Sequence, residues 1–259
     1  MRRQFLLMVC AVQFLTRLPT PTLAHYQPDW VARAARYFPL VGQLVGAIAA
    51  LVLVGASTLW GGWVPALLAL AASVLVTGGF HEDGLADTAD GLLGGLDGPS
   101  RLSIMKDSRI GTYGVLALGL VTAIKGATLA GIEPLPAALS LVAAHGGGRA
   151  AAVVGMRLLP YAGETSASKW RRSADAPRTG EMALALLFAA WPLLLMPVSG
   201  AVAGLVVGAA LAFAPALAGR RLVGGQTGDI LGAVEQLFEL GFLLGAAAAA
   251  SQGATVWRP

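Results

Sequence analysis

The chain has 259 residues, of which 56% are hydrophobic and 12% charged, against roughly 25% charged in an ordinary soluble domain. The apolar residues form long blocks, which excludes a water-soluble globule and predicts one integral membrane domain over residues 1–259. The net charge is +4, but the bases lie at the ends of apolar blocks, so nucleic-acid binding is not indicated. The single cysteine, Cys10, excludes an intramolecular disulfide.

The first apolar run, residues 5–15, is flanked by Arg2, Arg3 and Arg17. It is too short to span a bilayer, and no small-x-small cleavage site follows it before Pro19. We therefore expect a short interfacial or re-entrant helix. A true span and a cleaved signal peptide are the alternatives.

Seven longer apolar runs follow, several of them separated by turns that contain Gly or Pro. They predict an all-α fold, a polytopic membrane bundle of about seven transmembrane helices. The runs cover residues 38–60, 63–80, 111–132, 135–156, 182–198, 200–218 and 230–250.

Every second connection between these runs is basic, whereas the turns near residues 61, 133 and 199 contain no Lys or Arg. By the positive-inside rule the basic connections lie in the cytoplasm and the C-terminus lies outside. The bases concerned are Arg33, Arg36, Arg101, Lys106, Arg109, Arg157, Lys169, Arg171, Arg172, Arg178, Arg220 and Arg221.

Residues 81–110 form an acidic loop between the second and third long runs. If residues 83–90 are helical, Asp83, Asp87 and Asp90 share one face. Carboxylates at this spacing repel one another, so a cation is their natural complement. All-oxygen ligation favours Mg²⁺ or Mn²⁺ over zinc. We predict a metal site on this face, with a solvated acidic loop as the alternative.

Cationic and acidic side chains near this face complete a candidate phosphoryl-transfer site. A divalent metal combined with Lys and Arg neutralises a pyrophosphate and its leaving group. His81 is either a general base, a metal ligand or a polar cap of the helix end. The candidate catalytic residues are Asp83, His81, Lys106, Asp107 and Arg109.

Four ionisable residues fall inside apolar runs: Lys125, Arg149, Glu235 and Glu239. Such residues are costly in a bilayer and mark a polar interior. They either neutralise one another across the bundle, or Lys125 and Arg149 bind substrate phosphate in a cavity that opens to the cytoplasm. His145, four residues before Arg149, is interpreted as incidental.

A Gly-rich turn precedes the last run, from Gly224 to Gly228. Exposed backbone N–H groups at a helix N-terminus bind anions. Together with Arg221, Thr227 and Asp229, this turn is predicted to form a second half of the same site.

Five ordered motifs resemble the cobalamin synthase family, the adenosylcobinamide-GDP ribazoletransferases, over nearly the whole chain. The segment Thr77–Gly91 carries the most specific of them. The others are Phe14–Pro19, Phe38–Gly42, Ile104–Gly111 and Gly224–Ala233. Glu82 and Lys106 occupy positions that vary in the family, so neither receives a unique role.

The resemblance implies a Mg²⁺-dependent transferase of late cobalamin (vitamin B12) synthesis in the bacterial inner membrane, with its active site on the cytoplasmic side. The 5′-oxygen end of α-ribazole, or of its 5′-phosphate, would attack the phosphoryl group attached to cobinamide in adenosylcobinamide-GDP, and GMP would leave. We expect substrate-binding roles for Arg17, Lys125, Arg149, Arg221, Thr227 and Asp229. Membrane lipid and other late-pathway enzymes are the expected partners, and a homo-oligomer is left open.

Two alternatives remain at this point. The aspartate pattern is also similar to that of the CDP-alcohol phosphotransferases, but Asp87 stands where their pattern has Arg, and the spacing to the later aspartates differs. A transporter could bury Lys125, Arg149, Glu235 and Glu239 along an ion path. It would not need the aspartates at the membrane edge.

Overall fold

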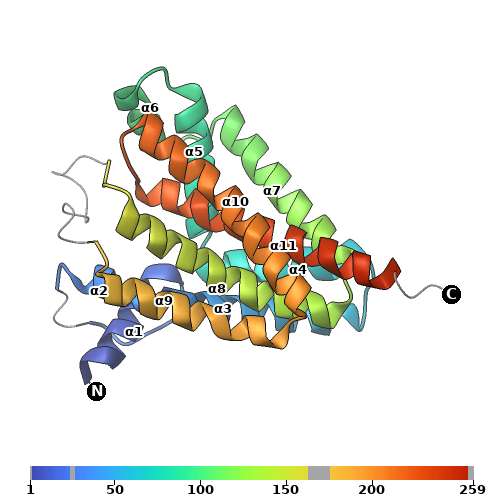
Figure 1. Cartoon of the computed structure of the whole chain (residues 1–259). Coiled ribbons are helices and arrows are strands. Elements are labelled where there is room, and N and C mark those ends of the chain that lie inside the picture. Colours follow the sequence, from blue (N-terminus) through green and yellow to red (C-terminus); the bar gives the residue numbers. More distant parts are fainter. Residues whose placement is uncertain (1, 24–26, 163–175, 256–259) are drawn as a thin grey trace.

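The computed structural model describes residues 2–23, 27–162 and 176–255. Within these residues all regular structure is helical, apart from one isolated bridge between Tyr161 and Gln226, so the predicted all-α class is confirmed (Figure 1). The α-helices are α1 (Arg2–Leu15), α2 (Trp30–Ala34), α3 (Phe38–Ser57), α4 (Trp63–Thr77), α5 (Phe80–Gly94), α6 (Gly98–Met105), α7 (Thr112–Ala130), α8 (Pro134–Leu158), α9 (Thr179–Ala190), α10 (Val198–Leu222) and α11 (Gly228–Thr255), with 3₁₀ helices η1 (Ala35–Tyr37) and η3 (Trp191–Leu195).

Five helical segments of the described chain are long and apolar enough to cross a membrane. A sixth is counted only if α4 and α5, which meet at a bend of 92°, form one broken span. The predicted count of about seven is therefore not confirmed, because the runs 63–80 and 182–198 form shorter helices. The five segments are Trp30–Ser57, Thr112–Ala130, Pro134–Leu158, Val198–Leu222 and Gly228–Ala250.

Helix α1 has 14 residues, about 21 Å at 1.5 Å per residue, which is too short to cross the roughly 30 Å hydrocarbon core. Its buried side chains, among them Leu7 and Cys10, pack with Trp30 and Phe38 of the segment that follows. This length agrees with the predicted non-spanning helix, and its place at the membrane interface stays a prediction.

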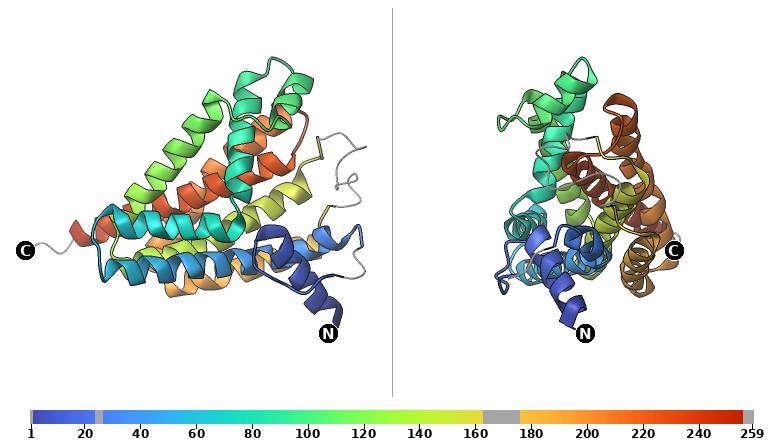
Figure 2. Two further views of the ribbon diagram at one scale, coloured as in Figure 1. Left: turned by 180° about the vertical axis from the view of Figure 1, so that it is seen from behind. Right: turned by 90° about the vertical axis from the view of Figure 1, so that its left-hand side faces the viewer.

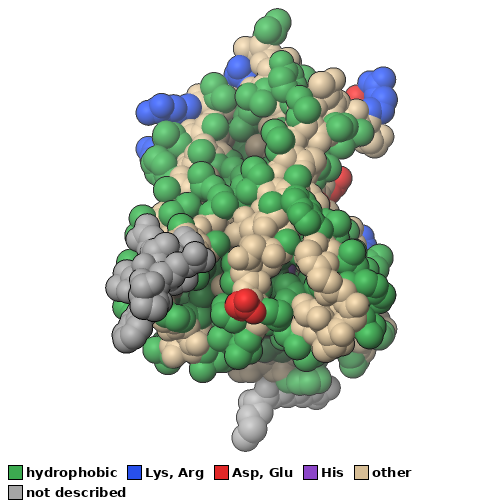
Figure 3. All heavy atoms as spheres, turned by 90° about the vertical axis from the view of Figure 1, so that its right-hand side faces the viewer, with side chains coloured by type: hydrophobic (Ala, Val, Ile, Leu, Met, Phe, Trp, Pro, Cys, Tyr) green, Lys and Arg blue, Asp and Glu red, His purple; other side chains and the backbone are tan. Residues whose placement is uncertain are grey.

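The outer surface carries many large apolar side chains. Leu51, Leu75, Leu120 and Val206 are each more than 60% exposed, far from what a soluble protein tolerates over a wide area. Viewed from the end where the C-terminus lies, hydrophobic side chains cover most of the visible face (Figure 3). This surface fits a lipid environment.

Helices α8 and α11 form the centre of the bundle, since 78% of each span is buried, against 28% for α7 and for α10. Small residues bring the backbones close together, as in other membrane bundles. A Cβ atom on Gly148 would lie 3.0 Å from the carbonyl oxygen of Glu235, for example. Polar side chains on α8 and α11 therefore face each other at short range.

The connections predicted to be basic gather at one end of the bundle, on the left in Figure 1, and the turns near 61, 133 and 199 lie at the other end, with the C-terminus. Lys169, Arg171 and Arg172 lie outside the described residues. The separation of the two kinds of connection agrees with the positive-inside argument. Which end faces the cytoplasm stays a prediction.

Two glycines produce the bend between α4 and α5. Gly78 and Gly79 have φ angles of +71° and +70°, which L side chains rarely adopt, and both backbone N–H groups donate to the carbonyl of Val74. Helix α5 then leaves steeply from the direction of α4 (Figure 2). Helices α5 and α6 occupy most of the segment 81–110, so the acidic connection between the apolar runs contains the helix that was considered for residues 83–90.

Candidate active site on helix α5

Helix formation over residues 80–94 confirms that Asp83, Asp87 and Asp90 share one face. Their surroundings differ, because Asp83 is exposed, Asp87 is half-buried and Asp90 is buried. The face thus runs from solvent into the protein, and its three carboxylates are not equivalent.

The Asp90 side chain accepts hydrogen bonds from backbone N–H groups at the start of α7. Its Oδ2 accepts a hydrogen bond from the Gly111 N–H at 2.7 Å, and its Oδ1 accepts one from the Gly114 N–H at 2.9 Å. A carboxylate is favourable there because the first N–H groups of a helix lack partners within the helix. Both oxygens are thus already in use, and metal binding by Asp90, which stays a prediction, is the least supported of the three.

Asp87 lies among like charges. Burial, followed by the charges of Asp83, Asp229 and Asp90, raises the pKa of Asp87 to about 7, and α5 is not one of the five spans. A carboxylate whose neighbours disfavour its ionised form is well suited to gain from a bound cation. Asp229, in the first turn of α11, therefore belongs beside the acidic face of α5.

Close packing of α5 on α11 brings Asp229 to this position. A Cβ on Gly84 would lie 3.0 Å from the Asp229 Cα and 3.2 Å from the Gly232 Cα. Only glycine at position 84 permits this approach without a shift of backbone. The acidic motif and the Gly-rich motif, about 145 residues apart in the chain, thus form one surface, as the sequence predicted.

Thr227 begins α11. Its Oγ1 accepts a hydrogen bond from the Ile230 N–H at 3.2 Å and donates one to Asp229 Oδ2 at 3.3 Å. This is the capping role that Thr commonly has at a helix start. Arg221 lies exposed in the last turn of α10. Substrate binding by Thr227, Asp229 and Arg221 stays a prediction.

Residues 106–109 follow the end of α6, where Lys106, Ser108 and Arg109 are exposed and Asp107 is half-buried. Arg109 Nη2 pairs with Asp107 Oδ2 at 2.6 Å, and hydrogen bonds from Arg109 lower the pKa of Asp107 to about 2. So acidic a group is a weak base near neutral pH, which makes Asp107 a poor candidate for the general base. Lys106 is exposed at the end of α6.

Arg17 lies at the α4–α5 bend. Its backbone N–H donates to the Val76 carbonyl at 2.7 Å, and its side chain covers Gly78. The residue is exposed, so its guanidinium lies at the surface close to where α5 begins.

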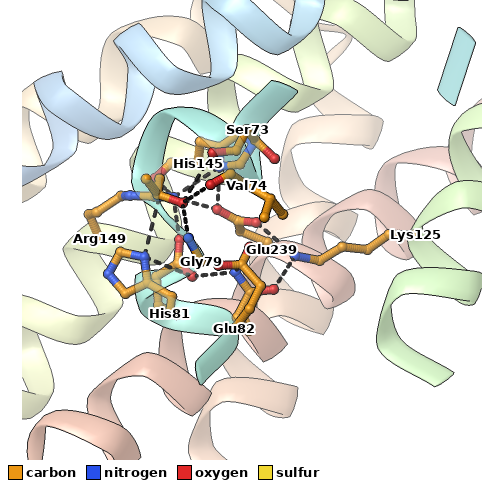
Figure 4. Close-up of polar contacts among 12 residues, drawn as sticks. Ser73, Val74, Gly79, His81, Glu82, Lys125, His145, Arg149 and Glu239 are labelled. Atoms are coloured by element: carbon orange, nitrogen blue, oxygen red, sulfur yellow. Dashed lines mark hydrogen bonds and ion pairs between the residues drawn. The ribbon is translucent and has the colours of Figure 1, made fainter. Parts of the chain in front are cut away.

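A buried ion network lies behind the start of α5 (Figure 4). Arg149 is 2% exposed and pairs with Glu235 and Glu239. It also contacts the Nδ1 atoms of His145, at 2.9 Å, and His81, at 3.4 Å. The charges from α8 and α11 thus neutralise one another inside the bundle.

Lys125 extends this network to α7. Its Nζ donates to Gln236 Oε1 and to Glu239 Oε2, each at 2.7 Å. Gln236 in turn donates to Glu82 Oε1 at 3.1 Å, which links the network to α5. Four helices are therefore joined by one set of polar contacts.

These contacts realise the predicted mutual neutralisation of Lys125, Arg149, Glu235 and Glu239. A phosphate-binding role for Lys125 and Arg149 stays a prediction that the contacts do not support, and a basic role for His81 stays untested. His145 was interpreted as incidental, yet it contacts both Arg149 and Glu239. The i, i+4 spacing of His145 and Arg149 is a signal for that contact.

Among the described residues, His145, Glu235 and Glu239 are the group of three whose ligand atoms all lie within 4.8 Å of one another. Arg149 and Lys125 already neutralise these carboxylates, so the group does not need a metal. The aspartates of α5 are not drawn together in this way. Their donor set nevertheless fits Mg²⁺, which binds through one or two carboxylates together with water and substrate phosphates.

Comparisons with known proteins agree on one family. The family model for cobalamin-5-phosphate synthase matches residues 7–247. A protein of Leptothrix cholodnii named adenosylcobinamide-GDP ribazoletransferase is 44% identical over 91% of this chain and 92% of its own length. Proteins of the same name from Shewanella amazonensis and Azorhizobium caulinodans are each 41% identical, covering 92% and 91% of this chain and 94% and 92% of their own lengths.

No solved structure is significantly similar to the chain. The match to the family model covers all the helices that carry the acidic face, the Gly-rich turn and the ion network. The chain therefore belongs to the cobalamin-5-phosphate synthase family, a family of enzymes of cobalamin synthesis.

Proposed function

We propose that the chain condenses adenosylcobinamide-GDP with α-ribazole or α-ribazole 5′-phosphate, giving adenosylcobalamin or its 5′-phosphate together with GMP. The names of the relatives support the class of reaction. The observation that carries the proposal is the carboxylate surface formed by Asp83, Asp87 and Asp229 where α5 packs on α11. Such a surface would hold the cation that offsets the negative charge of a pyrophosphate substrate.

The proposed metal is Mg²⁺, held by Asp83 and Asp87, with Asp229 beside it. When bound, Mg²⁺ supplies charge neutralisation at the pyrophosphate and at the departing GMP. The support is the all-oxygen donor set and the pKa of Asp87, which neighbouring carboxylates and burial raise to about 7. Asp90 is assigned to the start of α7, where it keeps Gly111 and Gly114 in place.

The remaining residues orient the substrates. In the reaction a ribose hydroxyl that is free in both acceptors, and so is not the 5′-hydroxyl, loses its proton and forms a bond to the phosphorus attached to cobinamide. The bond from that phosphorus to GMP breaks, GMP leaves, and a phosphodiester results. Arg17, Lys106 and Arg109 are exposed cations that we assign to the phosphates of the GDP group. Asp107, ionised above its pKa of about 2, holds Arg109 in place.

We place the enzyme in the bacterial inner membrane, with the α5 end of the bundle in the cytoplasm. The concentration of basic connections at that end supports this orientation. Lipid surrounds the exposed apolar side chains, and soluble substrates reach the acidic face from the cytoplasm.

Complementation tests the proposal in cells that lack their own enzyme of this family. Asp83→Ala should abolish cobalamin-dependent growth, because the exposed Asp83 carboxylate would no longer bind the metal. Glu133→Ala, which removes an exposed carboxylate at the other end of the bundle, should support normal growth. Both variants must be present in the membrane fraction at the wild-type level. Normal growth with Asp83→Ala would reject a catalytic role for the acidic face.

A further inference from the structure

A cavity of about 350 Å³ lies behind the acidic face, between α1, α3, α5, α8 and the start of α11. Its volume falls at the lower end of the roughly 300–1,000 Å³ range of small-molecule sites. The wall formed by Gly228 and Gly232 belongs to the same helical turns as Asp229. The cavity thus lies beside the first turns of α11, which also carry Asp229.

Aromatic rings form one side of this cavity. Phe14 stacks on Phe38, with ring centroids 5.6 Å apart and an angle of 13° between the planes. Phe80 meets Phe14 edge to face at 5.4 Å, and all three rings line the cavity. Such a wall favours a flat, apolar ring system.

One polar side chain of the cavity wall has a buried atom without a hydrogen-bond partner in the described part of the chain. The Nε atom of Arg149 is buried without any hydrogen bond, although the other end of its guanidinium pairs with Glu235 and Glu239. Gln226 also lines the cavity and is 6% exposed, and its position is fixed by backbone hydrogen bonds with Pro160 and Ala162. Buried polar groups without partners are costly and are commonly completed by a ligand.

We propose that this cavity binds the base of the acceptor nucleoside, ribazole, with Arg149 as the polar contact of the base and Gln226 as the polar contact of the sugar. This inference rests on the proposed function. The benzimidazole of ribazole is flat, carries methyl groups and has a single free ring nitrogen, which accepts the hydrogen bond that the Arg149 Nε–H has to offer. Guanine would bring several donors and acceptors that the aromatic wall does not satisfy, and a corrinoid ring is too large for the volume.

The position of the cavity explains why it serves the acceptor. A nucleoside whose base lies against Phe14 and Phe38 directs its ribose toward Gln226 and Gly228. The ribose end then points past the start of α11 toward Asp229 and the acidic face, where the phosphoryl group is transferred. The amide of Gln226 is the hydrogen-bonding partner for the sugar.

Two variants of the full-length protein in nanodiscs test this assignment. Ala152→Phe fills the cavity from α8, and Gln226→Met removes the amide at similar volume. Leu51→Phe, on the exposed face of α3, is the matched control. Equilibrium dialysis of α-ribazole, without adenosylcobinamide-GDP, measures binding separately from turnover. Thermal unfolding confirms that each variant is folded.

We expect Ala152→Phe to abolish α-ribazole binding, and Gln226→Met to raise its Kd and its KM by about tenfold, with kcat and the KM for adenosylcobinamide-GDP unchanged. If Ala152→Phe does not fold, Gln226→Met carries the test. Unchanged α-ribazole binding in the folded variants would overturn the assignment. The assignment would also be overturned if Ala152→Phe lost co-purified lipid but still bound α-ribazole, because the cavity would then be a lipid site.

The two proposals can fail separately. If wild-type protein binds α-ribazole through Gln226 but releases no GMP from adenosylcobinamide-GDP, the assignment of the cavity stands and the proposed reaction is wrong. If GMP is released but α-ribazole binding ignores Gln226 and Ala152, the reaction stands and the cavity assignment is wrong.

Discussion

The carboxylates of α5 differ in what they touch, and that difference sets what each can do. Asp83 is exposed, Asp87 is half-buried among like charges, and Asp90 is committed to two backbone N–H groups. The spacing along a helix predicted that the three aspartates share a face, but it could not predict that their surroundings differ. Their surroundings differ because the start of α7 packs against Asp90 and because α11 places Asp229 near Asp87.

Substitution of Asp83 is expected to lower activity, whereas substitution of Asp90 is expected to lower stability. Asp83→Asn should lower kcat by about a hundredfold or more and leave thermal unfolding unchanged, because the side chain is exposed. Asp90→Asn should lower the free energy of unfolding by about 1–2 kcal/mol, because two N–H groups at a helix start lose a charged acceptor. GMP release and thermal unfolding in detergent measure the two effects. Equal loss of stability in both variants would contradict this expectation.

The raised pKa of Asp87 predicts a dependence of stability on pH. Between its ordinary value of 3.8 and the native value of about 7, the folded protein binds more protons than the unfolded chain, so stability falls as pH rises through this window. The metal-free protein should therefore unfold at a lower temperature at about pH 8 than at about pH 6. Mg²⁺ should reverse the loss, and Asp87→Asn should remove this part of the pH dependence. An identical pH profile for Asp87→Asn would show that Asp87 is not the group responsible.

At the scale of elements, the site depends on two junctions, the bend between α4 and α5 and the packing of α5 on α11. The sequence predicted a stop at Gly78 and Gly79 but not the direction in which the chain continues. That direction arises from two consecutive positive φ angles. The sequence placed the acidic and Gly-rich motifs in one site, and the close approach at Gly84 is the physical reason.

Gly84→Ala tests the second junction. The added Cβ would lie 2.9 Å from the Asp229 carbonyl oxygen, so α5 and α11 must move apart and GMP release should fall by about tenfold or more. Gly119→Ala, where a Cβ meets nothing within 4 Å, is the control on α7 and should keep full activity. Full activity in Gly84→Ala would mean that Asp229 does not need to lie against α5.

At the scale of the whole molecule, the apolar runs predicted the helices and their order, whereas the number of spans is not confirmed. The run 182–198 divides into α9 and η3, and the run 63–80 ends at Thr77, since hydropathy alone does not register a Pro or a Gly pair that ends a helix. The buried network was one of two open alternatives in the sequence. Arg149 pairs with Glu235 and Glu239 because α8 packs against α11, and the sequence does not show that packing.

Orientation in the membrane is a prediction for the whole molecule. In a Cys10→Ser background, which removes the one native cysteine, Thr58→Cys and Ser108→Cys place exposed thiols at the two ends of the bundle. A reagent that does not cross membranes should label Thr58→Cys in intact cells, and Ser108→Cys only after the inner membrane is made permeable. The reverse pattern would place the acidic face outside the cytoplasm.

The most direct test of the central claim is GMP release by the purified protein in nanodiscs, supplied with adenosylcobinamide-GDP and α-ribazole, with and without Mg²⁺. We expect that Mg²⁺ is required and that GMP and the corrinoid product form in equal amounts. No turnover by folded protein with either α-ribazole or its 5′-phosphate, or turnover that is unaffected by removal of divalent metal, would contradict this claim.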